Sequence, residues 1–270
     1  MSSSLANQLV FITGASAGIG AACAEAFARQ GARLLLCARR SDRINALADR
    51  LHREYDVEVD TFMLDVRDAD AVSTRMQSLP ESWQAIDILI NNAGLARATD
   101  KVYENKTSDI NQMVDTNVKG LLYVTRAVVP GMVKRGRGHI INLGSTAGHS
   151  VYTGGTVYCA TKYAVGAITE GLKMDLHGTP VRVSSVDPGL VETEFSVVRF
   201  SGDVDRANAV YAGMQPLTAE DVADAILYCA TRAPHVNISE IIMMPVAQSS
   251  ATMVHRDVTP EQEPEAEEAN

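Results

Sequence analysis

Short apolar segments alternate with longer segments of helical periodicity along most of the chain. The apolar segments are rich in β-branched residues, which predicts buried strands. These segments are 9–13, 33–38, 57–65, 86–91, 139–143, 182–186 and 241–244. Helices are predicted over 19–30, 42–55, 68–79, 107–134, 156–176 and 219–231. Because each pair of strands is separated by a helix, we predict one α/β domain with a doubly wound parallel sheet, the Rossmann arrangement.

Two regions depart from this alternation. Residues 190–215 contain Gly202 and Gly213 and have mixed polarity, which favours a loop over the substrate site. Residues 257–270 contain six acids, two prolines and no base, a composition typical of a disordered, solvated tail. We therefore expect a domain over 1–256, with a substrate loop at 190–215, followed by an acidic tail over 257–270.

Charge and composition narrow the classes of partner. The net charge is −9, and six of the acids lie in the tail, so residues 1–256 carry only −3. A body without a basic stripe argues against nucleic acid as a partner. No apolar stretch approaches the roughly 20 residues of a membrane span, and the first residues lack the order of a secretory signal.

Cysteine usage indicates the redox environment. The four cysteines are far apart and form no CxxC pair, which favours reduced thiols in a cytoplasmic protein. We expect no bound metal.

A glycine-rich turn connects the first predicted strand to the first helix. Residues 13–20 read Thr-Gly-Ala-Ser-Ala-Gly-Ile-Gly, which lets the backbone approach a pyrophosphate at a helix N-terminus. The candidate cofactor residues of this turn are Gly14, Ser16, Ala17, Gly18, Ile19 and Gly20. Glycine-rich turns also occur for packing reasons, but the place of this one between strand and helix favours nucleotide binding.

The end of the second strand indicates which cofactor is used. NAD enzymes commonly have an acid here for the ribose 2′-hydroxyl, whereas this chain has Arg39 and Arg40. A guanidinium fork suits a 2′-phosphate, so NADP is the predicted cofactor. The alternative is that both arginines are merely solvated.

Tyr158 and Lys162 are spaced by one helical turn. A nearby cation favours phenolate, so we expect Lys162 to lower the pKa of Tyr158 and to make it a proton donor and acceptor. Ser145 follows the fifth predicted strand and could bind the same substrate oxygen.

These motifs, together with Asn91–Gly94, Asn117 and Pro188-Gly189, resemble the short-chain dehydrogenase/reductase family in order and spacing over roughly residues 5–250. The resemblance implies seven parallel strands and reversible hydride transfer with a nicotinamide. It implies catalytic roles for Tyr158, Lys162, Ser145 and, in a proton relay through water, Asn117. It also implies cofactor contacts from Asp65, Val66, Asn92, Ala93, Gly94, Tyr158, Lys162, Pro188, Gly189 and Thr193.

More specific segments, including 144–148, 175–179, 188–200 and 243–248, resemble the NADP-dependent 3-hydroxy acid dehydrogenases. That subgroup includes serine and allo-threonine dehydrogenases and malonic semialdehyde reductases. The resemblance implies oxidation of serine, allo-threonine, 3-hydroxyisobutyrate or 3-hydroxypropionate. Ser145, Tyr158 and Arg199 are the candidate substrate residues, and Arg199 could bind the substrate carboxylate as a fork.

Alternatives stay open at this point. Arg199 could instead make a surface or subunit contact. The chain could reduce another carbonyl class, such as a 3-oxoacyl thioester, a sugar or a cyclic ketone, or it could be an NADP-binding regulator without turnover. The predicted helices 107–134 and 156–176 are long and apolar, and the family pairs them between subunits, which implies a homotetramer.

Overall fold

The computed structural model describes residues 5–257. Their strands form one seven-stranded parallel sheet in the order β3-β2-β1-β4-β5-β6-β7. The strands are β1 (Leu9–Thr13), β2 (Arg33–Ala38), β3 (Val59–Met63), β4 (Ile88–Asn91), β5 (Gly138–Leu143), β6 (Val181–Pro188) and β7 (Glu240–Met243). The predicted fold class is therefore confirmed. Of the predicted tail, all but Asp257 lies outside the described residues.

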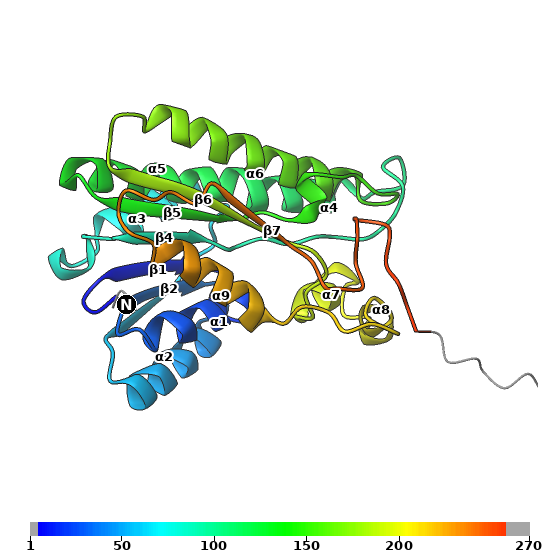
Figure 1. Cartoon of the computed structure of the whole chain (residues 1–270), viewed down its shortest axis with the longest axis horizontal. Helices are drawn as coiled ribbons and strands as arrows, with labels where there is room; N and C mark the ends of the chain where they lie inside the picture. The colour runs from blue at the N-terminus through cyan, green and yellow to red at the C-terminus, as the bar shows by residue number, and fades with distance from the viewer. Residues whose placement is uncertain (1–4, 258–270) are drawn as a thin grey trace, which may run out of the picture.

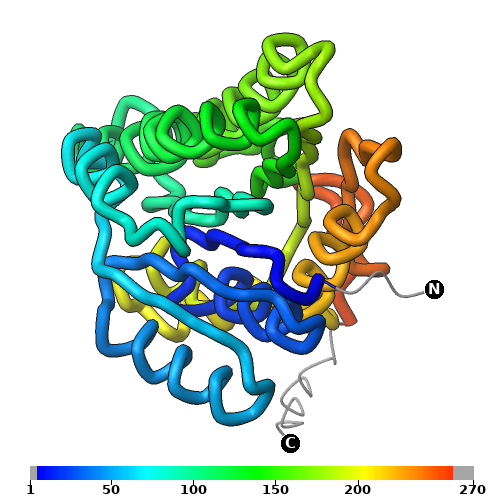
Figure 2. The backbone as a smooth tube through the Cα atoms, turned by 90° about the vertical axis from the view of Figure 1, so that its left-hand side faces the viewer, coloured from blue at the N-terminus to red at the C-terminus, as the bar shows by residue number. Residues whose placement is uncertain are grey.

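Helices cover both faces of the sheet (Figures 1 and 2). One face carries α1 (Gly18–Ala28), α2 (Ser41–Tyr55) and α9 (Ala219–Ala230). The other carries α3 (Ala69–Gln77), α4 (Thr107–Val114), α5 (Leu121–Arg135) and α6 (Thr156–Asp175). β1 is buried along its whole length, with Val10 and Ile12 in one core and Leu9 and Phe11 in the other. This explains its continuous apolar sequence, because alternate side chains enter opposite layers.

All strands end at the same edge of the sheet, and the order reverses direction between β1 and β4. The loops after β1, β4, β5 and β6 therefore meet at that edge, which is where ligands bind in open α/β sheets.

Two parts of the chain differ from the sequence-based expectation. The predicted helix over 107–134 is interrupted by a π-helical segment, η2 (Asp115–Gly120), between α4 and α5. Residues 190–215 are not one loop but contain α7 (Glu194–Arg199) and α8 (Val204–Ala209), which lie beyond the end of the sheet (Figure 1). Both helices are too short to show a periodicity, and each is started by a side-chain cap, from Thr193 and Asp203 respectively.

Candidate active site

A cleft of about 460 Å³ lies at the carboxyl edge of the sheet. Most of the predicted cofactor residues line it: Gly14, Ser16, Ala17, Gly18, Ile19, Arg39, Arg40, Asp65, Val66, Asn92, Ala93, Gly94, Pro188, Gly189 and Thr193. The four predicted residues Ser145, Tyr158, Lys162 and Arg199 line the same cleft. Sequence positions almost 190 residues apart are thus brought to one site.

The glycine-rich turn packs closely against the loop after β4. A Cβ atom on Gly14, whose φ is +69°, would lie 2.9 Å from Cα of Ala93. Gly20 does not line the cleft, and a Cβ atom there would lie 2.5 Å from Nδ2 of Asn92. Gly20 therefore serves close packing, while Ala17, an N-cap without a side-chain acceptor, leaves the start of α1 open to an anionic ligand.

The two arginines after β2 differ in their contacts. Arg40 donates to Oγ of Ser16 at 3.0 and 3.2 Å and pairs with Glu194 at 2.8 Å. Arg39 is exposed at the cleft. The hydrogen bond from Arg67 is the main cause that holds the pKa of Asp65 below its usual range, and the charge of Arg39 adds to it.

Arg43 pairs with the other oxygen of Glu194. Arg39 and Arg40 therefore line one end of the cleft, and Arg43 lies beside Arg40 through their shared partner Glu194.

Ser145, Tyr158 and Lys162 lie at the base of the cleft. Ser145 follows β5 and caps η3 (Thr146–Gly148) by accepting from the Ala147 N–H at 3.1 Å. One turn of α6 separates Tyr158 from Lys162, whose Nζ lies 5.8 Å from the centre of the phenol ring. Lys162 donates to the carbonyl oxygen of Leu143 at 2.8 Å, so the end of β5 positions both Ser145 and the ammonium group.

The expectation of a lowered pKa for Tyr158 is wrong for this structure. Burial raises the pKa of Tyr158 above its ordinary value, and the nearby Tyr152 adds to this, whereas the hydrogen bond with Ser145 and the charge of Arg199 oppose it. Burial also lowers the pKa of Lys162 to about 8. Desolvation is therefore the largest cause of the shift in both groups.

Asn117 lies behind the cleft rather than in it. It is buried in the π-helical segment η2, where its side chain accepts from the N–H of Leu95 at 2.9 Å and donates to the Leu95 carbonyl at 2.8 Å. It also donates to Thr161 of α6 at 3.0 Å. Asn117 therefore ties the loop after β4 to the helix that carries Tyr158 and Lys162. A π-helical turn at such a position is common at functional sites.

Arg199 at the end of α7 lies near Tyr158. Its guanidinium carbon lies 5.9 Å from the ring centre of Tyr158 and 5.5 Å from that of Tyr152, and Nη2 donates to the Tyr152 hydroxyl at 2.8 Å. Nε donates to the Ala98 carbonyl at 3.4 Å. The ring of Phe195, on the preceding turn of α7, lies 5.6 Å from that of Tyr158. A cation and three aromatic rings thus lie together in one part of the cleft.

Sequence reasoning missed several residues of the cleft. Tyr152 and Gln248 line it, and Gln248 accepts from the N–H of Leu190 at 2.8 Å. Glu194 also lines the cleft and pairs with Arg40 and Arg43. These side chains come from segments without a recognisable nucleotide motif, and only the position of Glu194 directly after Thr193 could have indicated it.

The four cysteines are buried and unpaired, as expected for reduced thiols. Within residues 5–257, no helix is both long and apolar enough to span a membrane.

Comparison with known proteins is consistent with the geometry of this cleft. The family model described as short chain dehydrogenase matches residues 8–203. The NADP-dependent 3-hydroxy acid dehydrogenase YdfG of Salmonella typhi is 48% identical over 251 residues, covering 92% of this chain and 100% of that protein. Sulfoacetaldehyde reductase 2 of Chromohalobacter salexigens is 45% identical, covering 93% of this chain and 100% of that protein.

Among solved structures, the closed form of serine dehydrogenase complexed with NADP+ matches with a TM-score of 0.88 and 46% identity, covering 93% of this chain and 100% of that chain. The cleft, its motifs and these similarities agree, and the chain belongs to the short-chain dehydrogenase family.

Proposed function

We propose that this protein is an NADP-dependent dehydrogenase that reversibly oxidises the 3-hydroxyl group of short 3-hydroxy acids. The observation that carries the proposal is the position of Arg199, whose guanidinium lies 5.9 Å from the Tyr158 ring inside the cleft. A substrate with an anionic group a few atoms from its reacting carbon would place the anion at Arg199 and the carbon at Tyr158. Short 3-hydroxy acids have this layout.

The residues present fit NADP. Glycines 14 and 18 have positive φ values that let the turn approach a pyrophosphate, and the start of α1 offers unpaired N–H groups. Arg39, Arg40 and Ser16 offer donors for a 2′-phosphate. The relatives named for NADP use support the same cofactor. When bound, the nicotinamide accepts or supplies the hydride.

The side chains at the base of the cleft would handle the proton. Tyr158 exchanges a proton with the substrate oxygen, and Ser145, which is hydrogen-bonded to Tyr158, orients that oxygen. Lys162 stabilises the phenolate electrostatically and holds the nicotinamide ribose. Asn117, which contacts Leu95 and Thr161, supports a water-mediated path for the proton from Lys162 toward solvent.

Arg199 and Tyr152 would bind the carboxylate. The guanidinium provides a planar pair of donors, and the Tyr152 hydroxyl, which now accepts from Nη2, lies beside it. Arg199 is partly buried beside the two tyrosine rings, which limits competition from water and strengthens the charge-assisted bonds. This placement favours a ligand contact for Arg199 over the surface or subunit contact that the sequence left open.

A sulfonate is the second candidate anion, because a relative at 45% identity is named a sulfoacetaldehyde reductase. Arg199 and Tyr152 offer donors that suit either a carboxylate or a sulfonate. The cation beside Tyr158 favours a short anionic substrate over a thioester or a cyclic ketone.

The experiment that tests the proposal is an assay of NADP reduction with a panel of substrates. We expect turnover with serine, allo-threonine, 3-hydroxyisobutyrate or 3-hydroxypropionate, and none with uncharged alcohols of the same length. Reduction of sulfoacetaldehyde by NADPH without oxidation of any 3-hydroxy acid would favour the second candidate. Binding of NADP without turnover of any substrate would instead favour a regulator.

A further inference from the structure

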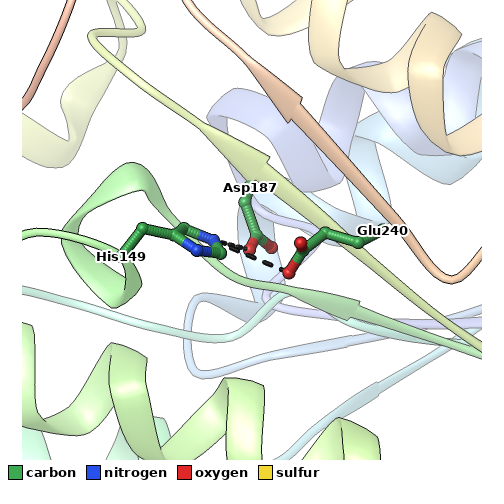
Figure 3. A group of neighbouring side chains, drawn as sticks. All are labelled: His149, Asp187 and Glu240. Carbon is green, nitrogen blue, oxygen red and sulfur yellow. Dashed lines mark hydrogen bonds and ion pairs between the residues drawn. The ribbon is translucent and has the colours of Figure 1, made fainter.

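His149, Asp187 and Glu240 form a cluster of side chains (Figure 3), and Asp187 directly precedes Pro188, which lines the cleft. They come from the loop after η3, from β6 and from β7 respectively, and their side chains point toward one another. Nε2 of His149 lies 2.5 Å from Oδ2 of Asp187 and 3.6 Å from Oε1 of Glu240. No part of this cluster belongs to the motifs that identify the family.

Asp187 is the buried member of the cluster. Its side chain is 4% exposed, compared with 35% for His149 and 44% for Glu240. The hydroxyl of Ser185 donates to its Oδ1, while His149 occupies Oδ2. Both carboxylate oxygens are therefore fixed, which is the usual condition for a charge buried this deeply.

The Asp187 carboxylate lies against the segment that directly follows β5. A Cβ atom on Gly144 would lie 2.0 Å from Oδ1 of Asp187, so the absence of a side chain at Gly144 makes room for the acid. Gly144 separates Leu143, whose carbonyl holds Lys162, from the catalytic Ser145. Asp187 also directly precedes Pro188, whose carbonyl accepts from Ser145 at 3.4 Å.

The charge on Asp187 acts on Lys162. Burial lowers the pKa of Lys162, and Asp187 is the charged group of the described chain that opposes this effect. The other titratable groups beside Asp187 are His149 and Glu240, and Asp187 contributes, after burial, to a raised pKa of Glu240. An ammonium this buried needs a nearby negative charge to stay protonated.

We propose that Asp187 is a positioning residue for Lys162. Its carboxylate, fixed by Ser185 and His149, packs against Gly144 and so holds the turn whose Leu143 carbonyl binds the Lys162 ammonium, and it supplies a negative charge next to that turn. This inference rests on the proposed function in that it takes Lys162 as the catalytic lysine. It adds the residue on which the charge of that lysine depends.

A divalent cation is the competing interpretation, because the ligand atoms of the three residues lie within 4.8 Å of one another. His149 and Ser185 already satisfy both oxygens of Asp187 by hydrogen bonds, and this favours the ionic cluster. The proposal therefore requires full activity without an added metal.

The first test is the pH profile of kcat/KM for substrate oxidation by the Asp187→Asn enzyme. This substitution keeps the shape of the side chain but removes its charge, so Lys162 should lose its proton at lower pH. We expect the alkaline limb to move to lower pH by about one unit. The matched control is Asp87→Asn at the opposite end of the sheet, where the carboxylate accepts from the Leu9 N–H and pairs with Arg137. Equal alkaline limbs in both variants and the unmodified enzyme would overturn the proposal.

The second test does not depend on activity. Thermal unfolding is measured for Asp187→Asn alone and in combination with Lys162→Met. We expect the Asn substitution to lower Tm by about 2 °C more when Lys162 is present than when it is replaced. Equal losses would contradict a charge contact between the two residues. If Lys162→Met retains full activity, the proposed catalytic role of Lys162 fails, while this cycle still decides whether Asp187 supports its charge.

A third experiment tests whether the three residues bind a metal ion. The enzyme is dialysed against EDTA and then assayed with and without added Zn²⁺. Unchanged activity supports the ionic cluster. Loss of activity that Zn²⁺ restores would overturn the proposal and make the three residues a metal site.

Discussion

Desolvation dominates the chemistry of the residues at the base of the cleft. Tyr158 and Lys162 are both buried, and burial shifts the pKa of each toward its neutral form. A buried phenol without further stabilisation is a poor base at neutral pH. The proposed reaction therefore needs every nearby positive charge, including Lys162 and Arg199, to stabilise the phenolate.

The role of Tyr158 is tested by Tyr158→Phe. The substitution keeps the ring that packs against Phe195 but removes the exchangeable proton. We expect kcat to fall by about 10²- to 10⁴-fold, while NADP still binds. The measurements are steady-state kinetics and cofactor binding by fluorescence. A variant that kept a tenth of normal activity would show that another group transfers the proton.

The buried Lys162 is also expected to cost stability. Its folded-state pKa of about 8 lies below the ordinary value of 10.5, so the unfolded chain binds more protons between these values. Stability of the unmodified protein should therefore rise as the pH increases through this window, and the full cost is present below about pH 8.

Lys162→Met should for this reason be inactive but more stable at pH 7, by about 1–3 kcal/mol. The gain should shrink between pH 8 and 10. Urea unfolding of both proteins at two pH values measures it. A variant less stable than the unmodified protein at pH 7 would show that the hydrogen bond to Leu143 outweighs the desolvation of the ammonium.

At the scale of elements, sequence pattern predicted the regular part of the fold well. β1 and β2 begin and end where the pattern placed them, because strands buried on both faces have continuous apolar sequences. Element ends such as those of β3 were less accurate, since its residues are only partly buried. Most of the motif residues were predicted to meet in one cleft because they follow strand ends, where parallel topology brings them together, whereas Tyr158 and Lys162 reach it from α6.

The helices and contacts that the sequence did not predict lie in segments without periodicity. α7 and α8 are six residues each, less than two turns, so no amphipathic repeat could mark them. The contact of Tyr152 with Arg199, and that of Asp187 with His149, join residues 47 and 38 positions apart through tertiary packing. The raised pKa of Tyr158 could not be predicted either, because it depends on how completely folding excludes water from the phenol.

The contact between the end of β2 and α7 leads to a prediction on cofactor preference. Arg40 donates to Ser16 and pairs with Glu194 at the start of α7, and Arg39 is exposed at the cleft. We expect NADP to be preferred over NAD by at least about tenfold in kcat/KM, about 1.4 kcal/mol. Replacement of both arginines by Ala should raise KM for NADP and change NAD use little. Equal use of the two cofactors by the unmodified enzyme would contradict this interpretation.

At the scale of the whole molecule, the outer surfaces of α5 and α6 predict an assembly. Several apolar residues of these helices, including Leu121, Val124, Val128 and Val165, are buried in the protein's own core. The exposed surface nevertheless carries Leu122, Tyr163 and Met174, which are 41%, 45% and 67% exposed. A Cβ atom on Gly166 or Gly171 of α6 would meet open space, so another helix could approach closely.

We therefore predict a homotetramer with twofold axes. Light scattering at micromolar concentration should give about four times the 29.0 kDa chain mass. Leu122→Glu and Met174→Glu together should lower that mass, whereas Met63→Glu, at an exposed position on β3 away from α5 and α6, serves as the control. A monomer mass for the unmodified protein would refute the prediction.

The proposed function depends most on Arg199, which is expected to bind the anionic group of the substrate. A buried charge-assisted hydrogen bond contributes about 1.5–3 kcal/mol, so Arg199→Ala should lower kcat/KM for a 3-hydroxy acid by about 10- to 150-fold. The most direct measurement is a kinetic cycle of two enzymes, unmodified and Arg199→Ala, against the acid and its methyl ester. We expect a loss on the acid alone, with partial rescue by Arg199→Lys, which supplies charge without the planar fork. Equal losses on acid and ester would contradict the claim and assign Arg199 to holding α7 against Ala98.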